Sequence, residues 1–248
     1  KMTRPGGPQP AAAPITTAFP VRPQRDVVAV EGPDAVTFLQ GQLSQDIAAL
    51  AVGDRSWSLL LHPQGKVQSW LGVRREGDDR VLLDVDAGFG DSVVERLSRF
   101  LIRTKATVEV TDRGVVVDPD GADVTDADRI AAGIPAMGAE LDERTIPAEV
   151  GQWFVDASVS FTKGCYTGQE LVARVDSRGS NVPRHLRVVT VDGGVTIPAG
   201  AEVLSGEAVV DTVTSSADGL ALAYVKRAVE PPASVTLRWD GGEATATI

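Results

Sequence analysis

Short apolar runs and helical spacings of apolar residues follow one another through the first half of the chain. Runs rich in Val, Leu and Trp, bounded by Gly, Pro or charged residues, predict strands over 27–30, 57–61, 67–73 and 81–85. Apolar side chains at three-to-four spacing predict two helices, over 36–43 and 93–101. We also expect a hairpin over 108–117 that turns at Asp112-Arg113-Gly114, and a short helix over 128–132.

Tight turns join most of these predicted strands, which favours antiparallel pairing over a doubly wound parallel sheet. The predicted class is therefore α+β, with mainly antiparallel sheet lobes. After residue 183 the pattern changes to short β-prone runs separated by Gly, Pro, Asp and Ser, over 187–191, 208–213, 221–225 and 234–239. Short strands at this spacing are typical of a small barrel or sandwich.

Three regions follow from these changes along the chain. Residues 1–24 are rich in Pro, Gly and Ala and have no periodicity, so we expect a flexible N-terminal arm. The alternative is an arm that lies along the folded body. We expect a main region of two lobes over 25–183 and a C-terminal β region over 184–248.

Charge and cysteine content exclude several functional classes. The net charge of −10 argues against a broad nucleic-acid surface and against binding to an anionic membrane. No apolar stretch approaches the roughly 18 residues of a membrane span. The single cysteine excludes an intramolecular disulfide and cannot supply four thiolates to an iron–sulfur cluster, so we predict no metal site in the chain alone. We expect a cytoplasmic monomer that binds neither nucleic acid nor membrane directly.

The single cysteine lies in a sequence that suits a reactive group. Cys165 falls between Gly164 and Gly168, just before a helix that we predict to begin at Gln169. A helix N-terminus and a nearby cation, here Lys163, both lower the pKa of a thiol. We therefore hypothesise a reactive thiolate, with a buried structural cysteine as the alternative.

The same segment is locally basic. Residues 163–187 hold five Lys or Arg and two acidic residues, a local charge of +3 in an acidic chain. Arginine pairs well with carboxylate and phosphate, so one interpretation is a site for an anionic small molecule. The other is a solvated basic face.

The segment KGCYTGQE, followed by LVAR, resembles the signature of the YgfZ-type folate-binding proteins. These are a branch of the superfamily that includes the glycine-cleavage aminomethyltransferase (GcvT). The signature residues here are Cys165 and its loop neighbours Lys163, Gly164, Tyr166, Thr167, Gly168, Gln169 and Glu170. Further segments similar to that family lie at 34–46, 63–66, 146–149, 213–216 and 221–227. The resemblance covers roughly residues 27 to 230.

This resemblance implies a GcvT-like folate-binding fold, with antiparallel sheet lobes around a central opening and a small C-terminal β-barrel. It implies tetrahydrofolate, or a folate derivative, as the cofactor bound in that opening. It also implies a role in iron–sulfur cluster assembly or repair, with client or assembly proteins as partners. From the local charge, Arg174, Arg178 and Arg184 are the predicted partners of the anionic folate tail.

One departure from the superfamily bears on catalysis. Aminomethyltransferases carry an Asp-Asp pair in the hairpin where this chain has Ser69-Trp70, and no carboxylate occurs between Gly65 and Val73. A general acid or base must lie within hydrogen-bond reach of its proton. One alternative function is a folate-dependent one-carbon (aminomethyl) transferase, but the chain lacks the acid that this reaction is expected to use. A ligand-free interaction module with the same fold is the other.

Overall fold

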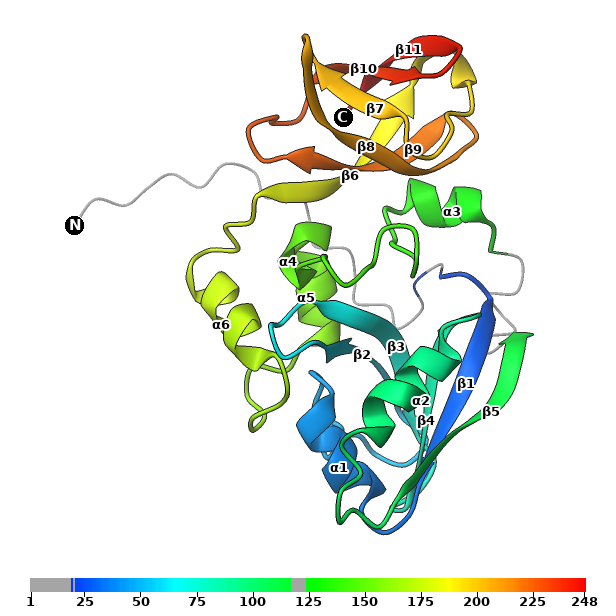
Figure 1. Cartoon of the computed structure of the whole chain (residues 1–248), viewed down its shortest axis with the longest axis vertical. Coiled ribbons are helices and arrows are strands. Elements are labelled where there is room, and N and C mark those ends of the chain that lie inside the picture. The colour runs from blue at the N-terminus through cyan, green and yellow to red at the C-terminus, as the bar shows by residue number, and fades with distance from the viewer. Residues whose placement is uncertain (1–18, 20, 117–123) are drawn as a thin grey trace, which may run out of the picture.

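The computed structural model describes residues 19, 21–116 and 124–248. Figure 1 shows the C-terminal β-barrel at one end of the long axis and a sheet with two helices toward the other, with the remaining helices between them. Most of the predicted N-terminal arm and most of the polar stretch ahead of residue 126 lie outside the described residues.

A five-stranded antiparallel sheet forms the first part of the fold. Its strands are β1 (Gln24–Glu31), β2 (Arg55–Leu61), β3 (Val67–Arg75), β4 (Arg80–Asp86) and β5 (Thr107–Val116). Their order is β2-β3-β4-β1-β5, so the strands predicted from apolar runs are confirmed. Two predicted helices are also confirmed, as α1 (Ala35–Gln42) and α2 (Gly90–Ser98). The second ends three residues earlier than the apolar spacing predicts.

The predicted hairpin over 108–117 is wrong. Residues 108–116 belong to one long strand, β5, that pairs with β1 through an irregular register near Val27, and residue 117 lies outside the described residues. Asp26 explains the difference, because its buried carboxylate accepts a hydrogen bond from the Gly114 amide at 3.0 Å. Gly114 has φ +61°, so the turn-like residues Asp112-Arg113-Gly114 form a bulge in a continuing strand.

Four short helices connect the sheet to the barrel. They are α3 (Asp126–Ala131), α4 (Pro147–Val150), α5 (Gln152–Ser158) and α6 (Gln169–Ser177). The short helix predicted over 128–132 is present as α3 but begins two residues earlier, at Asp126, where a capping box between Thr125 and Asp128 fixes its start. The predicted start of α6 at Gln169 is confirmed. The sequence analysis did not predict α4 and α5. In the described part of the chain, no helix is long and apolar enough to cross a membrane.

The C-terminal region is a closed barrel and not a sandwich. Its elements are β6 (Arg184–Val191), the 3₁₀ turn η2 (Asp192–Gly194), β7 (Glu202–Ser205), β8 (Ala208–Ala217), β9 (Leu220–Lys226), β10 (Ser234–Trp239) and β11 (Gly242–Thr247). The strand order is β10-β11-β6-β9-β8-β7, and β7 pairs with β10 to close it. Closure leaves no free edge strand.

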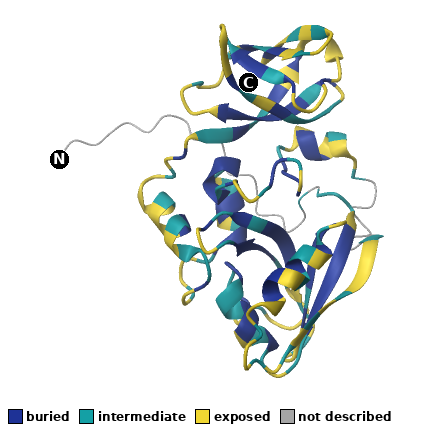
Figure 2. Cartoon of the chain, viewed as in Figure 1, coloured by how far each residue is buried: buried dark blue, intermediate teal, exposed yellow. Residues whose placement is uncertain are grey.

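Strand β9 serves two hydrophobic cores. Ala221, Ala223 and Val225 pack inside the barrel, whereas Leu222 and Tyr224 belong to the main core outside it. Successive side chains of a strand point to opposite faces, so one strand can fill both cores. Figure 2 shows the resulting buried band running from the sheet through α4 and α5 to the barrel.

A buried polar network reinforces this junction. The Arg129 guanidinium of α3 lies 2.9 Å from the Glu140 carboxylate, and both side chains are almost fully buried. From the barrel, the Ser215 hydroxyl donates to the same carboxylate at 2.6 Å. The Tyr224 hydroxyl donates to the Glu140 carbonyl at 2.9 Å. The network therefore satisfies the buried charges and ties α3 to β8 and β9.

An aromatic cluster lies where β2 and β3 meet α5. The rings of Trp57 and Trp70 stack with centroids 4.4 Å apart, and the Trp70 indole N–H donates to Ser158 at 3.0 Å. The centroid of the Phe19 ring lies 5.1 Å from that of Trp153 and 5.9 Å from those of Trp57 and Trp70. This described residue of the predicted arm thus contacts three indoles of the folded body.

We predict that Arg129→Met lowers the free energy of unfolding by about 3–5 kcal/mol, because it leaves the buried Glu140 charge without its partner. Arg144→Met is the matched control. Its pair with Asp142 is exposed, and losing such a pair costs about 0–1 kcal/mol. Urea unfolding of both variants measures the difference. Equal and small losses would contradict a stabilising junction.

Candidate functional site

The signature segment forms a loop between α5 and α6 that is fastened to the end of α1. The Lys163 ammonium donates to the main-chain carbonyls of Gln40, Leu43 and Gln45, at 2.6, 2.7 and 2.9 Å. These carbonyls lie at the C-terminal end of α1 and just beyond it, where the helix leaves acceptors unpaired and favours a cation. Lys163 therefore holds the loop in position, and its positive charge is balanced by the carbonyl groups at the end of α1 and just beyond it.

Burial dominates the acid–base behaviour of this lysine. Removing the ammonium from water lowers the pKa of Lys163 from 10.5 to about 8, and the charge of Asp46 opposes the shift. The ammonium also lies 5.2 Å from the centroid of the Tyr166 ring. Burial of that tyrosine raises its pKa to about 12, so the hydroxyl stays protonated at neutral pH.

Two glycines allow the loop to approach the β2–β3 hairpin closely. Gly168 has φ +84°, and a Cβ there would lie 2.6 Å from the His62 carbonyl oxygen. Gly65 has φ +78°, and a Cβ there would lie 2.4 Å from the Leu171 Cβ. Neither position accepts a side chain without strain. The glycines of the hairpin and the signature are thus two sides of one contact.

Hydrogen bonds within the loop leave Cys165 at its surface. The Thr167 amide donates to the Gly41 carbonyl at 3.1 Å, and the Tyr166 amide donates to the Gln169 side chain at 3.1 Å. Tyr166 is buried, whereas Cys165, like Glu170, is exposed. The alternative of a buried structural cysteine is therefore wrong.

Gly164 has a different place from the other signature glycines. It is exposed, and no atom lies within 4 Å of the position that a Cβ would take.

Among the residues that the structure describes, no three His, Cys, Asp or Glu side chains are grouped to hold a metal ion.

The hairpin position of the missing acid is filled by apolar packing. Ser69 and Trp70 are both buried in β3. Gln68 falls at a shift in the β2–β3 register, because Leu60 pairs with Ser69 and Leu61 pairs with Val67. The buried Gln68 Oε1 has no hydrogen-bond partner among the described residues. This leaves a free acceptor in β3, two residues before Trp70 in the chain.

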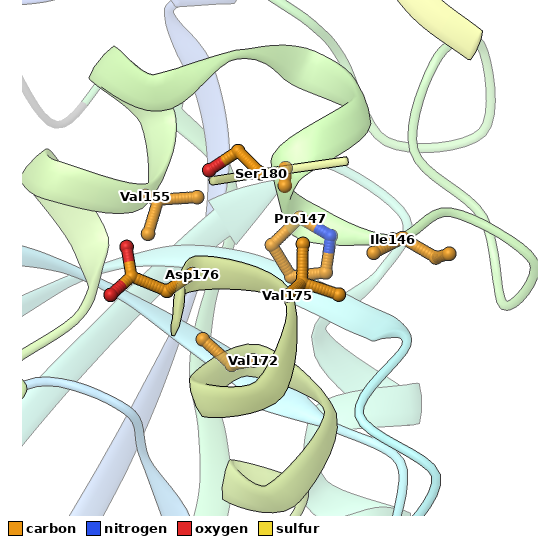
Figure 3. Close-up of a pocket in the computed structure, with 8 residues that line it drawn as sticks. Ile146, Pro147, Val155, Val172, Val175, Asp176 and Ser180 are labelled. Atoms are coloured by element: carbon orange, nitrogen blue, oxygen red, sulfur yellow. The ribbon is translucent and has the colours of Figure 1, made fainter. Parts of the chain in front are cut away.

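A small apolar pocket lies along the inner face of α6. Figure 3 shows Val172, Val175 and Asp176 of α6 beside Pro147 of α4 and Val155 of α5. A more polar, open cleft of about 470 Å³ adjoins it, and the two share Ala148 and Ser180 as wall residues.

Of the three arginines that local charge predicted for an anionic ligand, one lines this cleft. Arg178 lies there with His185, Arg187 and Arg227. Burial lowers the pKa of His185, and the charges of Arg187 and Arg227 lower it further. At neutral pH the arginines therefore carry the positive charge of the cleft.

The structure does not bring Arg174 and Arg184 to the cleft. Arg174 is exposed on α6. Arg184 lies 3.3 Å from Glu149, and its guanidinium lies 4.2 Å from the centroid of the Tyr224 ring. Because side chains alternate along a strand, it points away from His185, on the opposite face of β6.

Sequence reasoning missed Arg227, which lies far along the chain. The pairing of β6 with β9 sets His185 opposite Val225, and the Arg227 amide donates to the Pro183 carbonyl at 3.0 Å. Alternation along β6 groups His185 with Arg187, but the strand predicted over 187–191 begins after His185, and no local signal reveals the register that adds Arg227.

Sequence comparisons identify relatives of known name. No protein-family model matches the chain. It is 26% identical to the tRNA-modifying protein YgfZ of Pectobacterium carotovorum subsp. carotovorum (strain PC1), over 60% of this chain and 63% of that protein. It is 27% identical to the mitochondrial iron-sulfur cluster assembly factor IBA57 homolog of Mycosarcoma maydis, over 63% of this chain and 53% of that protein. The chain thus spans less than two thirds of the length of either relative.

The fold has a solved counterpart in glycine cleavage system aminomethyltransferase T from Bartonella henselae. The TM-score is 0.72, and the match covers 90% of this chain and 82% of that one. At 18% identity this likeness shows the fold alone. The predicted GcvT-like fold and the resemblance to YgfZ-type proteins are confirmed.

We predict that Gly168→Ala destabilises the protein by at least about 1–2 kcal/mol from its positive φ alone, with a further cost from the contact with His62. Gly164→Ala is the matched control, because that position is open, and its stability should stay within about 0.5 kcal/mol of wild type. Thermal unfolding compares the two. A Gly168→Ala protein as stable as the control would refute the close contact.

We also predict a pH dependence from Lys163. Its pKa is about 8 in the folded protein and 10.5 without burial, so the unfolded chain holds more protons between these values. The contribution of Lys163 to the free energy of unfolding is lowest below about pH 8 and rises with pH across that window. The stability of wild type relative to Lys163→Met should therefore increase between about pH 7 and about pH 10. A constant difference in urea unfolding would contradict this.

Proposed function

We propose that this protein is a tetrahydrofolate-binding factor for the assembly or repair of iron–sulfur clusters in client enzymes. The observation that carries the proposal is the signature loop, which is fastened to α1 by Lys163 and holds Cys165 at the surface. The names of the relatives, one a cluster assembly factor and one a tRNA-modifying protein, support this choice. The second name fits an indirect effect on RNA through a cluster enzyme.

The aromatic cluster fits the ring of a folate. A flat pterin needs apolar walls and a few directed polar groups. The partly exposed rings of Trp153 and Phe19 supply walls, and the buried Trp57 and Trp70 pack against Phe19. We assign the unpaired Gln68 Oε1, two residues before Trp70 in β3, as an acceptor for a ring N–H. These residues would hold the pterin, and bound tetrahydrofolate would supply one-carbon or reducing chemistry.

Cys165 is the group that we assign to contact with clients. Its thiol is exposed on a loop held at several points, so a partner can reach it without rearranging the fold. Thiolates are the usual ligands of iron–sulfur clusters. We propose that Cys165 meets a client or a cluster intermediate at this surface, with Lys163 as a positioning residue.

The hairpin argues against aminomethyl transfer as the main activity. Ser69 and Trp70 are buried where aminomethyltransferases carry acids, and neither side chain can act as a carboxylate base. The shared fold with aminomethyltransferase T therefore supports folate binding more than it supports that reaction.

Calorimetric titration with monoglutamyl tetrahydrofolate under anaerobic conditions tests this proposal. We expect micromolar binding by wild type and by Cys165→Ser. Stacking on an aromatic ring contributes about 1–3 kcal/mol, so Trp153→Leu should weaken binding by roughly fivefold or more. Trp239→Leu, in the barrel, is the control and should bind like wild type. A folded wild-type protein that binds no tetrahydrofolate would overturn the proposal and favour an interaction module.

A further inference from the structure

The open cleft beside α6 combines walls from separate parts of the chain. Arg178 lies at the C-terminal end of α6, Arg187 lies on β6, and Arg227 follows β9. Gln152 enters from α5. The volume of about 470 Å³ lies in the range of small-molecule sites. The cleft can therefore accept a ligand larger than a single ion.

The cleft carries positive charge with no negative charge among its lining residues to balance it. No Asp or Glu is among the residues that line it. Among the described residues, no carboxylate lies within 4.0 Å of the guanidinium of the exposed Arg178 or the half-buried Arg187, whereas the buried Arg25 and Arg129 are paired with carboxylates. Arg187 is half-buried, and burial lowers its pKa. Cations gathered without counter-charges favour an anionic ligand.

Neutral side chains complete the walls and hold them in place. The Ser180 hydroxyl donates to the Gln152 side chain at 2.8 Å, which links the end of α6 to α5. Arg227 donates to the side chain of Asn181, which orients its guanidinium along the cleft wall. The cleft therefore offers a mixture of fixed and free donors, as extended carboxylate ligands require.

We propose that this cleft binds a chain of linked carboxylates, namely the γ-linked oligoglutamate tail of a folate. The assignment to a folate rests on the proposed function, whereas the anion site rests on the cleft itself. Arg178, Arg187 and Arg227 project from three elements, so they suit charges spaced along a chain better than one compact ion. The tail site thus comprises Arg178 with Arg187 and Arg227, in place of the grouping with Arg174 and Arg184 that local charge predicted.

Helix α6 connects this cleft to the signature loop. The helix begins directly after Gly168 and ends directly before Arg178, and its nine residues span roughly 14 Å. Ala148 and Ser180 border both the cleft and the apolar pocket along α6. A ligand with an apolar body and an anionic chain could therefore lie along one continuous surface.

The test uses tri-γ-glutamate, which has no pterin, as the probe for calorimetry on the full chain. We expect binding that weakens about tenfold or more in Arg187→Gln and that falls with added salt. Arg178→Gln, at an exposed position, gives a second variant that should fold if the first does not. Arg174→Gln removes the same charge outside the cleft and should bind like wild type.

A second titration with inorganic tripolyphosphate distinguishes carboxylate from phosphate recognition. Tripolyphosphate binding without tri-γ-glutamate binding would overturn the proposal in favour of a phosphate site. Failure of both anions would also overturn it, as would equal weakening by Arg174→Gln. Because monoglutamyl tetrahydrofolate is titrated separately, failure of the cleft proposal can be told apart from failure of folate binding.

Discussion

The ammonium of Lys163 among three main-chain carbonyls is the interaction on which the candidate site depends. It joins the end of α1 to a loop about 120 residues further along the chain and so fixes the base from which Cys165 projects. The same charge that pairs with α1 is costly to bury, which is why its pKa falls to about 8. The closely apposed Gly65 and Gly168 complete the contact where no side chain could fit.

The junction between the barrel and the rest of the fold determines how the walls of the basic cleft are placed. Outward side chains of β9 enter the main core while its inward side chains fill the barrel, and Glu140 accepts hydrogen bonds from both sides. The cleft with Arg187 and Arg227 lies on this boundary. Its geometry therefore depends on how firmly β6 and β9 are held against α4, α5 and α6.

Strong local patterns were enough to predict much of the fold. The apolar runs of β1 to β4 and the spacing in α1 needed no distant information. The predicted hairpin at Asp112-Arg113-Gly114 failed because its turn-like residues are satisfied by Asp26, far away in the chain. Strands β7 and β11 were missed because the first is short and the second, Gly242–Thr247, has few apolar residues.

The sequence predicted which segment forms the loop of the candidate site, but it did not predict the residues from other parts of the chain that this segment contacts. The motif predicted the loop, and the place of Cys165 before α6 is confirmed. The sequence placed Lys163 near the thiol but did not reveal that its ammonium contacts carbonyls at the end of α1 and just beyond it. Likewise, local charge identified Arg178 but grouped it with Arg184, which strand alternation turns to Glu149 on the other side of β6.

These contacts give a physical reason to connect the fold with the proposed role in cluster assembly or repair. The fold is shared with an aminomethyltransferase. At the hairpin positions where the resemblance implies an acid pair, this chain has the buried Ser69 and Trp70. The chain has an exposed thiol on a fixed loop, an aromatic cluster between the sheet and α5, and a basic cleft.

Amide hydrogen exchange of the signature loop tests the central claim most directly. The Thr167 amide donates to the Gly41 carbonyl, so it should be protected in wild type. In Lys163→Met the loop loses its anchor, and this protection should fall while amides in the barrel keep theirs. Exchange of Thr167 at the rate of an unprotected amide in wild type, or unchanged protection in the variant, would contradict the fastening of the loop by Lys163.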